Sequence, residues 1–156
     1  MMTQLDVTDT PSESDLATIT GGLTAFNAAD IGPSERRPLG VLIRDEGGKT
    51  IGGISGYTGW GWLFTQLLYV PETLRGQGMA GKLLEAAEAE AMARGCFGAW
   101  IDTFNPQALR AYQRQGYAVF GELPDFPVGR SRFFLQKKLA PANGNEATCS
   151  TSSVTL

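Results

Sequence analysis

The sequence predicts an α+β fold built as one domain. The chain has 156 residues, of which 42% are hydrophobic and 19% charged, and this is the size and composition of a single globular domain. Its first half holds strand-like runs separated by glycine turns, a pattern typical of antiparallel hairpins. Its second half alternates helical and strand-like patterns, as a β-α-β unit does. A hairpin-rich half joined to a β-α-β unit and a closing hairpin is an α+β arrangement.

An N-terminal helix is expected to begin at a capping box. Thr10 supplies the capping hydroxyl, Pro11 suits the first helical position and Glu13 completes the box. The pair Gly21-Gly22 weakens the middle of this helix. Apolar residues at helical spacing support it: Leu16, Ile19, Leu23 and Phe26.

The remaining elements follow from changes of hydrophobic period and from turn residues. A short strand candidate covers 5–7. The expected hairpin strands are 39–44, 50–57 and 62–70, with turns at 45–49 and 59–61. The second half should hold a helix at 79–94 closed by Gly95, a strand at 96–103, a helix at 106–115 ended by Gly116, and strands at 117–120 and 132–138.

Charge and residue counts exclude several classes of function. Thirteen basic and 16 acidic residues leave a net charge of −3, which argues against a protein that grips nucleic acid or an anionic membrane. The chain has no histidine, so catalytic triads that need histidine and histidine metal ligands are excluded. Two cysteines are too few for a four-thiolate zinc site. We therefore expect no metal, no nucleic acid partner and no membrane partner.

The chain termini suggest a location and a domain boundary. The first residues show no basic segment followed by an apolar one, so no signal peptide is expected, and no run reaches the roughly 18 apolar residues of a membrane span. The expected compartment is the cytoplasm. Residues 140–156 are rich in Asn, Gly, Ser and Thr, which predicts a disordered tail after a domain covering 1–139.

A glycine-rich loop between a strand and the long helix is the sharpest local signal. Glycines let backbone amides approach a ligand, and the helix N-terminus adds partial positive charge, so a phosphate or pyrophosphate is expected there. Gly76, Gly78 and Gly81 match a dinucleotide-binding pattern, but five residues separate the strand from the first glycine. The segment also resembles a phosphate-binding P-loop, but Leu83 stands where a magnesium-binding Ser or Thr is needed. A tight strand-to-helix connection without a ligand is the remaining alternative.

A third pattern fits the context. Arg75-Gly76-Gln77-Gly78-Met79-Ala80 resembles the pyrophosphate motif of the GNAT superfamily of acetyl-CoA-dependent N-acetyltransferases. Leu68-Tyr69-Val70 resembles the strand end that precedes this motif in the family. The spacing of Asn105, Ala108, Tyr112 and Gly116-Tyr117 matches a second family motif, and the element order agrees over roughly residues 4–139.

The resemblance implies a fold and a set of donor-binding residues. The fold would be the GNAT fold: a mixed central sheet flanked by helices and split between the strands that end near Val70 and Thr103. Acetyl-CoA would lie in that split as the acetyl donor. Backbone groups of Leu68, Tyr69 and Val70 would bind its pantetheine arm, and Asn105 would reach it from the far side. The pyrophosphate would be held by Arg75, Gly76, Gln77, Gly78, Met79 and Ala80.

The resemblance also implies direct attack of an amine on the thioester. A backbone N–H near Leu68 or Tyr69 would stabilise the oxyanion. Tyr112 would protonate the departing sulfur, because a phenol of pKa ~10 is protonated at neutral pH. No acid lies in 61–71, where some family members carry a glutamate. Deprotonation of the amine would then use water, relayed by Asp102, Glu122 or Asp125, or the amine would arrive neutral.

The acceptor pocket is expected among aromatic and charged residues of three loops. Aromatic rings with a carboxylate suit a small amine. Similar bacterial proteins often carry a histidine within 128–132, where this chain has Arg130, and an arginine cannot accept a proton at neutral pH. The candidate residues are Phe26, Trp60, Trp62, Asp125 and Arg130.

The sequence thus predicts an N-acetyltransferase that moves acetyl from acetyl-CoA to a primary amine of a small molecule. The alternatives are a protein lysine or N-terminal acetyltransferase, and a module that binds acetyl-CoA without turning it over. The expected partners are acetyl-CoA and an amine acceptor, and a homodimer is a further possibility that this fold offers.

Overall fold

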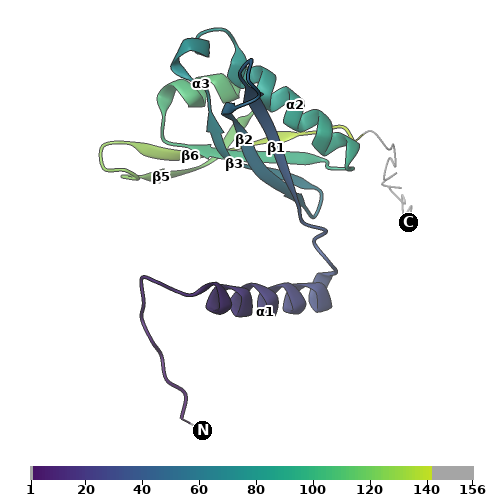
Figure 1. Ribbon diagram of the computed structural model, residues 1–156, viewed down its shortest axis with the longest axis vertical. Helices are drawn as coiled ribbons and strands as arrows, with labels where there is room; N and C mark the ends of the chain where they lie inside the picture. Colours follow the sequence, from purple (N-terminus) through teal and green to yellow (C-terminus); the bar gives the residue numbers. More distant parts are fainter. Residues whose placement is uncertain (1, 142–156) are drawn as a thin grey trace, which may run out of the picture. The chain divides into compact units, whose positions relative to one another are not determined.

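A computed structural model describes residues 2–141 of the chain. These residues form two compact units, one ending at Glu35 and the other beginning at Arg36, and each is described by itself. Figure 1 shows the elements of both units along the chain. Within 2–141, no helix is both long enough and apolar enough to cross a membrane. The predicted tail falls almost entirely outside these residues.

The first unit holds one helix, α1 (Glu13–Ile31). Its cap is Ser12 rather than the predicted Thr10: Ser12 Oγ accepts from Asp15 N at 3.0 Å, and Asp15 Oδ2 accepts from Ser12 N at 2.9 Å. This reciprocal pair makes the same type of capping box two residues later, because Asp15 can reach back where Glu13 was expected to. Residues 5–7 form no strand, which corrects that expectation; a strand needs a partner, and the described sheet begins with residue 37.

The second unit is a six-stranded mixed sheet with two α-helices and one short 3₁₀ turn. Its strands lie in the order β1-β2-β3-β4-β6-β5, and β3 and β4 are the parallel neighbours. Figure 1 labels β1, β2, β3, β6 and β5 of this sheet. The strands are β1 (Arg37–Arg44), β2 (Thr50–Gly59), β3 (Trp62–Tyr69), β4 (Gly98–Thr103), β5 (Ala118–Pro124) and β6 (Ser131–Lys138), and the helices are η1 (Glu72–Leu74), α2 (Met79–Ala93) and α3 (Pro106–Arg114). The predicted order of the second half and the mixed sheet are confirmed, with one difference: the strand expected at 117–120 runs from Ala118 to Pro124, because its pairing with β6 continues to that residue.

The hydrophobic core joins α2 and α3 to one face of the sheet. Helix α2 contacts β1, β2 and β3, whereas α3 contacts β4 and α2. The alanines of α2 that face the sheet, Ala87 and Ala91, are fully buried, so the helix approaches the strands closely. Leu63 of β3, Ile101 of β4 and Leu135 of β6 complete the centre of this core. The core therefore fixes the β3–β4 pair under the two helices.

The sheet opens between β3 and β4. Their parallel pairing ends at Thr65 and Ile101, although β3 continues to Tyr69 and β4 to Thr103. A bulge lies at the same point, because Ser55 pairs with Leu67 while Gly56 pairs with Thr65, which leaves Gln66 unpaired. A bulge increases local twist and bends its strand, so it directs β3 away from β4. Gly56 permits this close pairing: a Cβ there would lie 2.0 Å from the carbonyl oxygen of Phe64.

Candidate active site

A cleft of about 940 Å³ occupies the opening between β3 and β4. Its walls come from the end of β3, the loop before α2, the first turn of α2, the end of β4 and one face of α3. Backbone groups of β3 beyond Thr65 that face β4 have no strand partner, since the ladder has ended. An extended ligand can therefore pair with this strand edge as an added strand would.

The N-terminus of α2 forms one end of the cleft. Gly78 is the N-cap, in the left-handed conformation, and no side chain caps the helix. The first helical bond is donated by Lys82 N to Gly78 O at 3.1 Å, so the three preceding N–H groups have no partner within the helix. The first turn holds no acidic residue. A Cβ at Gly76 or Gly78 would meet open space, which leaves room for a phosphate beside the free amides.

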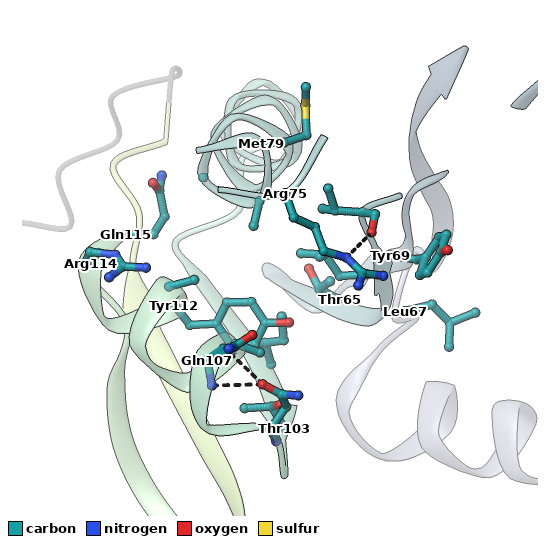
Figure 2. Close-up of a pocket in the computed structure, with 18 of the residues that line it drawn as sticks. Thr65, Leu67, Tyr69, Arg75, Met79, Thr103, Gln107, Tyr112, Arg114 and Gln115 are labelled. Carbon is teal, nitrogen blue, oxygen red and sulfur yellow. Dashed lines mark hydrogen bonds between the residues drawn. The ribbon is translucent and has the colours of Figure 1, made fainter. Parts of the chain in front are cut away.

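Arg75 links this loop to the end of β3. Its Nε donates to the carbonyl oxygen of Val70 at 2.9 Å, and its guanidinium lies 5.9 Å from the centre of the Tyr69 ring. Figure 2 shows the bond from Arg75 as a dashed line above the cleft. The remaining guanidinium N–H groups make no hydrogen bond with the described residues, so they are free for an anion.

Tyr112 projects from α3 into the cleft. In Figure 2 its ring extends from α3 toward β3, on whose side Thr65 lies. The residue is 5% exposed and belongs to the core around Ile101. Burial, together with the negative charge of Asp102, raises the pKa of Tyr112 to about 12. The phenol therefore stays protonated at neutral pH and can act as a proton donor.

Asn105 begins α3 at the opposite wall of the cleft. Its Oδ1 accepts from the backbone N–H groups of Gln107 at 2.8 Å and Ala108 at 3.1 Å, which makes it the N-cap. Both bonds are dashed in Figure 2. Since the cap uses the carbonyl oxygen, the side-chain amide N–H₂ of Asn105 is left to donate to a ligand.

Sequence reasoning missed two cleft residues that only strand pairing reveals. Thr65 is 2% exposed, and its Oγ1 has no hydrogen-bond partner among the described residues. Arg132 of β6 donates from Nη1 to Asp102 Oδ1 at 2.7 Å, and both residues line the cleft. Thr65 occupies a strand position typical of a core residue, and Arg132 is 30 residues from Asp102. Neither carries a local signal.

A buried charged group behind the cleft ties α2, α3 and β6 together. Glu88 of α2 is 3% exposed and forms an ion pair with Lys137 of β6. Lys137 Nζ also donates to the backbone carbonyl of Gln115 at 2.7 Å, just after the end of α3. Tyr117 lies beside them, and burial and the charge of Glu88 raise its pKa. This group holds α3, and with it Tyr112, against α2.

The structure places the predicted site residues unequally. Most predicted donor-binding residues line the cleft, but Gln77 does not: its side-chain amide donates to Thr73 O at 3.3 Å within the loop. Trp60 lies in the turn between β2 and β3, whereas Trp62 packs against Phe97 with ring centres 5.7 Å apart. Asp125 and Arg130 lie in the turn between β5 and β6, where Arg130 Nη1 donates to Phe104 O at 3.4 Å. Phe26 belongs to the first unit, and the role of these five residues in acceptor binding stays a prediction.

Within residues 2–141, no group of three or more acidic or cysteine side chains lies close enough together to hold a metal ion. The cleft brings together an open strand edge, free amides at a helix N-terminus, a buried phenol and one carboxylate.

Comparison with known proteins assigns the chain to a family. The model of the Acetyltransferase (GNAT) family matches residues 9–117. An acetyltransferase of Agrobacterium fabrum, Atu2258, is 47% identical over 133 residues, covering 85% of this chain and 95% of the relative. A blasticidin-S acetyltransferase of Streptomyces morookaense is 38% identical over 109 residues, covering 67% of this chain and 80% of the relative. The chain belongs to the GNAT acetyltransferase family.

Solved structures agree with this assignment. A crystal structure described as an acetyltransferase from Agrobacterium tumefaciens matches with a TM-score of 0.85 and 43% identity, covering 88% of this chain and all of that one. An acetyltransferase from Bacillus cereus matches with a TM-score of 0.76 and 25% identity, covering 88% of this chain and 98% of that one. Enzymes of this fold use acetyl-CoA, so the cleft belongs to an acyltransferase.

Proposed function

We propose that this protein is an N-acetyltransferase that moves acetyl from acetyl-CoA to a primary amine of a small molecule. The observation that carries the proposal is the continuity of the cleft: the open edge of β3, the uncapped N-terminus of α2 and the buried phenol of Tyr112 share one cavity. The likeness to a relative named for acetylation of blasticidin S supports a small-molecule acceptor.

The residues of the cleft fit acetyl-CoA. Free amides at 79–81 and the guanidinium of Arg75 suit its pyrophosphate, and open space beside Gly76 and Gly78 admits it. Leu68 and Val70 offer backbone groups to the pantetheine arm, and Asn105 offers its amide from the other wall. When bound, acetyl-CoA supplies an acetyl group already activated as a thioester, so no protein nucleophile is needed.

The protein's own residues then stabilise the developing negative charge and protonate the leaving sulfur. A backbone N–H at the open edge of β3, near Leu68 or Tyr69, stabilises the developing oxyanion. Tyr112 gives its phenolic proton to the leaving sulfur, since its pKa of about 12 keeps it protonated until that moment. The acceptor must reach the carbonyl as a neutral amine.

Thiol release across an amine panel tests the proposal. Purified protein is mixed with acetyl-CoA and with blasticidin S, small primary amines, or peptides that carry a lysine or a free N-terminus. Free coenzyme A is followed by a thiol reagent, and the acetylated product is identified by mass spectrometry. We expect release with a small amine. Acetylation of peptides alone would identify the protein as a protein lysine or N-terminal acetyltransferase. Tight acetyl-CoA binding without any release of coenzyme A would contradict the proposed enzymatic activity.

A further inference from the structure

We propose that Asp102 binds the ammonium group of the acceptor and takes its proton, directly or through one water molecule. This inference rests on the proposed N-acetyltransferase activity and names the residue that this activity still lacks. Among the described residues lining the cleft, Asp102 is the one acidic side chain.

The position of Asp102 in β4 places it on the acceptor side of the opening. Side chains alternate between the two faces of a strand. Ile101 and Thr103 are buried, and Ile101 shares the core that Tyr112 and α2 form. Asp102 therefore points to the other face, one residue beyond the last pair with β3. Because the donor's pyrophosphate site is at α2, an amine that enters from the opposite face meets Asp102 first.

The carboxylate is held in one orientation with an oxygen to spare. Arg132 Nη1 donates to Oδ1, while Oδ2 makes no hydrogen bond with the described residues. The Arg132 guanidinium lies 4.1 Å from the Phe126 ring centre and 5.0 Å from that of Phe104, so aromatic contacts also fix it. The side chain of Asp102 is 22% exposed, so part of it is accessible to a ligand. Oriented charge of this kind costs little reorganisation when the substrate binds.

Asp102 and Tyr112 line the same cleft. The negative charge of Asp102 contributes to the raised pKa of Tyr112, so the two groups share one electrostatic environment. In the reaction the attacking nitrogen and the leaving sulfur are bonded to a single carbon. The residue that takes a proton from nitrogen and the one that gives a proton to sulfur must therefore line one site, and Asp102 and Tyr112 line one cleft.

The other acids considered from the sequence are occupied elsewhere. Glu122 accepts from Ser131 Oγ at 2.6 Å on the β5–β6 hairpin. Asp125 accepts from Gly129 N at 3.5 Å in the turn of the same hairpin. Neither lines the cleft. The charged side chain that contacts Asp102 is Arg132, and Arg130 donates to the carbonyl of Phe104, two residues further along the chain.

The protons balance with these two residues. The bound ammonium gives one proton to Asp102, which releases it to solvent. The neutral nitrogen forms the bond to the acetyl carbon, the carbon–sulfur bond breaks, and Tyr112 gives its proton to the sulfur. The nitrogen then loses its second proton, which restores Tyr112 through solvent. The products are the amide, the free thiol and one proton.

The test compares Asp102→Asn with two other variants. Arg132→Gln breaks the same ion pair but keeps the carboxylate, and Glu85→Gln removes an exposed carboxylate of α2 outside the cleft. The probes are a primary amine that the wild-type protein acetylates, which is cationic at pH 7, and hydroxylamine, which is neutral there. Calorimetry also measures binding of that amine to the protein saturated with coenzyme A, and binding of coenzyme A itself.

We expect Asp102→Asn to lower kcat/KM for the cationic amine about 10²-fold, as loss of a general base does. The loss with hydroxylamine should be several times smaller, amine binding to the coenzyme A complex should weaken about 10-fold or more, and coenzyme A binding should not change. Glu85→Gln should match the wild type.

Equal losses for both nucleophiles, or equal losses in Asp102→Asn and Arg132→Gln, would mean that the ion pair only shapes the cleft, and would overturn the assignment. Activity of Asp102→Asn equal to the wild type would overturn it as well, while the proposed function stands. A wild-type protein that acetylates no amine contradicts the proposed function itself, and the inference with it.

Discussion

Arg75 Nε donates to the carbonyl oxygen of Val70 at 2.9 Å. This bond joins the glycine loop to the residue that directly follows β3. The bond fixes the guanidinium between two parts of the cleft that a single ligand would have to span: the strand edge and the helix N-terminus.

Replacing Arg75 should weaken donor binding more than turnover. A charge-assisted hydrogen bond contributes about 1.5–3 kcal/mol, so Arg75→Met should raise the Kd for acetyl-CoA ~10–100-fold. Arg75→Lys keeps the charge but loses the paired N–H donors of the guanidinium, so its Kd for acetyl-CoA should lie between those of the wild type and Arg75→Met. Calorimetric titration measures both. Arg110→Met, on the exposed side of α3, is the matched charge control; an equal loss there would point to general electrostatics instead.

Gly78 should be needed for the ligand as well as for the backbone. Gly78 and Gly95 have φ values of 73° and 85°, and a Cβ at either would meet open space. Alanine at either position should therefore cost about 1 kcal/mol of stability through backbone strain. Only Gly78→Ala should weaken acetyl-CoA binding, because only that Cβ would enter the cleft. Thermal unfolding and titration of both variants separate strain from ligand contact.

Tyr112→Phe should lower kcat about 10²-fold and leave the Kd for acetyl-CoA unchanged. The protonated phenol is the active form, so its contribution is lost only as pH rises toward its pKa of about 12. The wild-type kcat should then show no alkaline decline between pH 7 and about 10 from this group. A decline near pH 8 that disappears in Tyr112→Phe would contradict the raised pKa, and unchanged kcat would contradict the acid role.

The raised pKa of Tyr112 also predicts alkaline instability. The folded state holds the phenolic proton more tightly than the unfolded chain, whose tyrosine pKa is about 10. The stabilisation is therefore complete below pH ~10 and is lost as pH rises from there toward about 12. Denaturant unfolding of the wild type and of Tyr112→Phe at pH 8 and pH 11 measures this loss. Between these two pH values, the free energy of unfolding should fall more in the wild type than in Tyr112→Phe.

Thr65→Val should stabilise the free protein and weaken its binding of acetyl-CoA. The buried Oγ1 of Thr65 lacks a partner, and an unsatisfied buried hydroxyl costs about 1–3 kcal/mol. Removing it should raise the unfolding temperature by roughly 2–4 °C per kcal/mol gained. If the hydroxyl bonds the donor, the Kd for acetyl-CoA should rise at the same time. A variant that is both destabilised and unchanged in binding would show that the hydroxyl has a partner in solution.

Local patterns were sufficient to predict most elements of the second unit. The β1–β3 strands, α2, β4 and α3 lie within two residues of their expected bounds, because glycine turns and caps define such limits locally. The strand expected at 5–7 was wrong because pairing, which needs a distant partner, decides whether an extended segment becomes a strand. The cap of α1 lies at Ser12 and not at Thr10, because Ser12 and Asp15 form the reciprocal pair of hydrogen bonds of a capping box.

The sequence by itself determined the family resemblance, the donor motifs and the candidate acid, since each lies within a few consecutive residues or at helical spacing. Only the tertiary structure decided where the sheet opens, which of three acids reaches the cleft, and that Thr65 and Arg132 line it. These facts depend on strand register: the bulge at Gln66 ends the β3–β4 ladder, and the β4–β6 pairing brings Arg132 to Asp102 across 30 residues. Register is set by the packing of the whole sheet, which no local pattern contains.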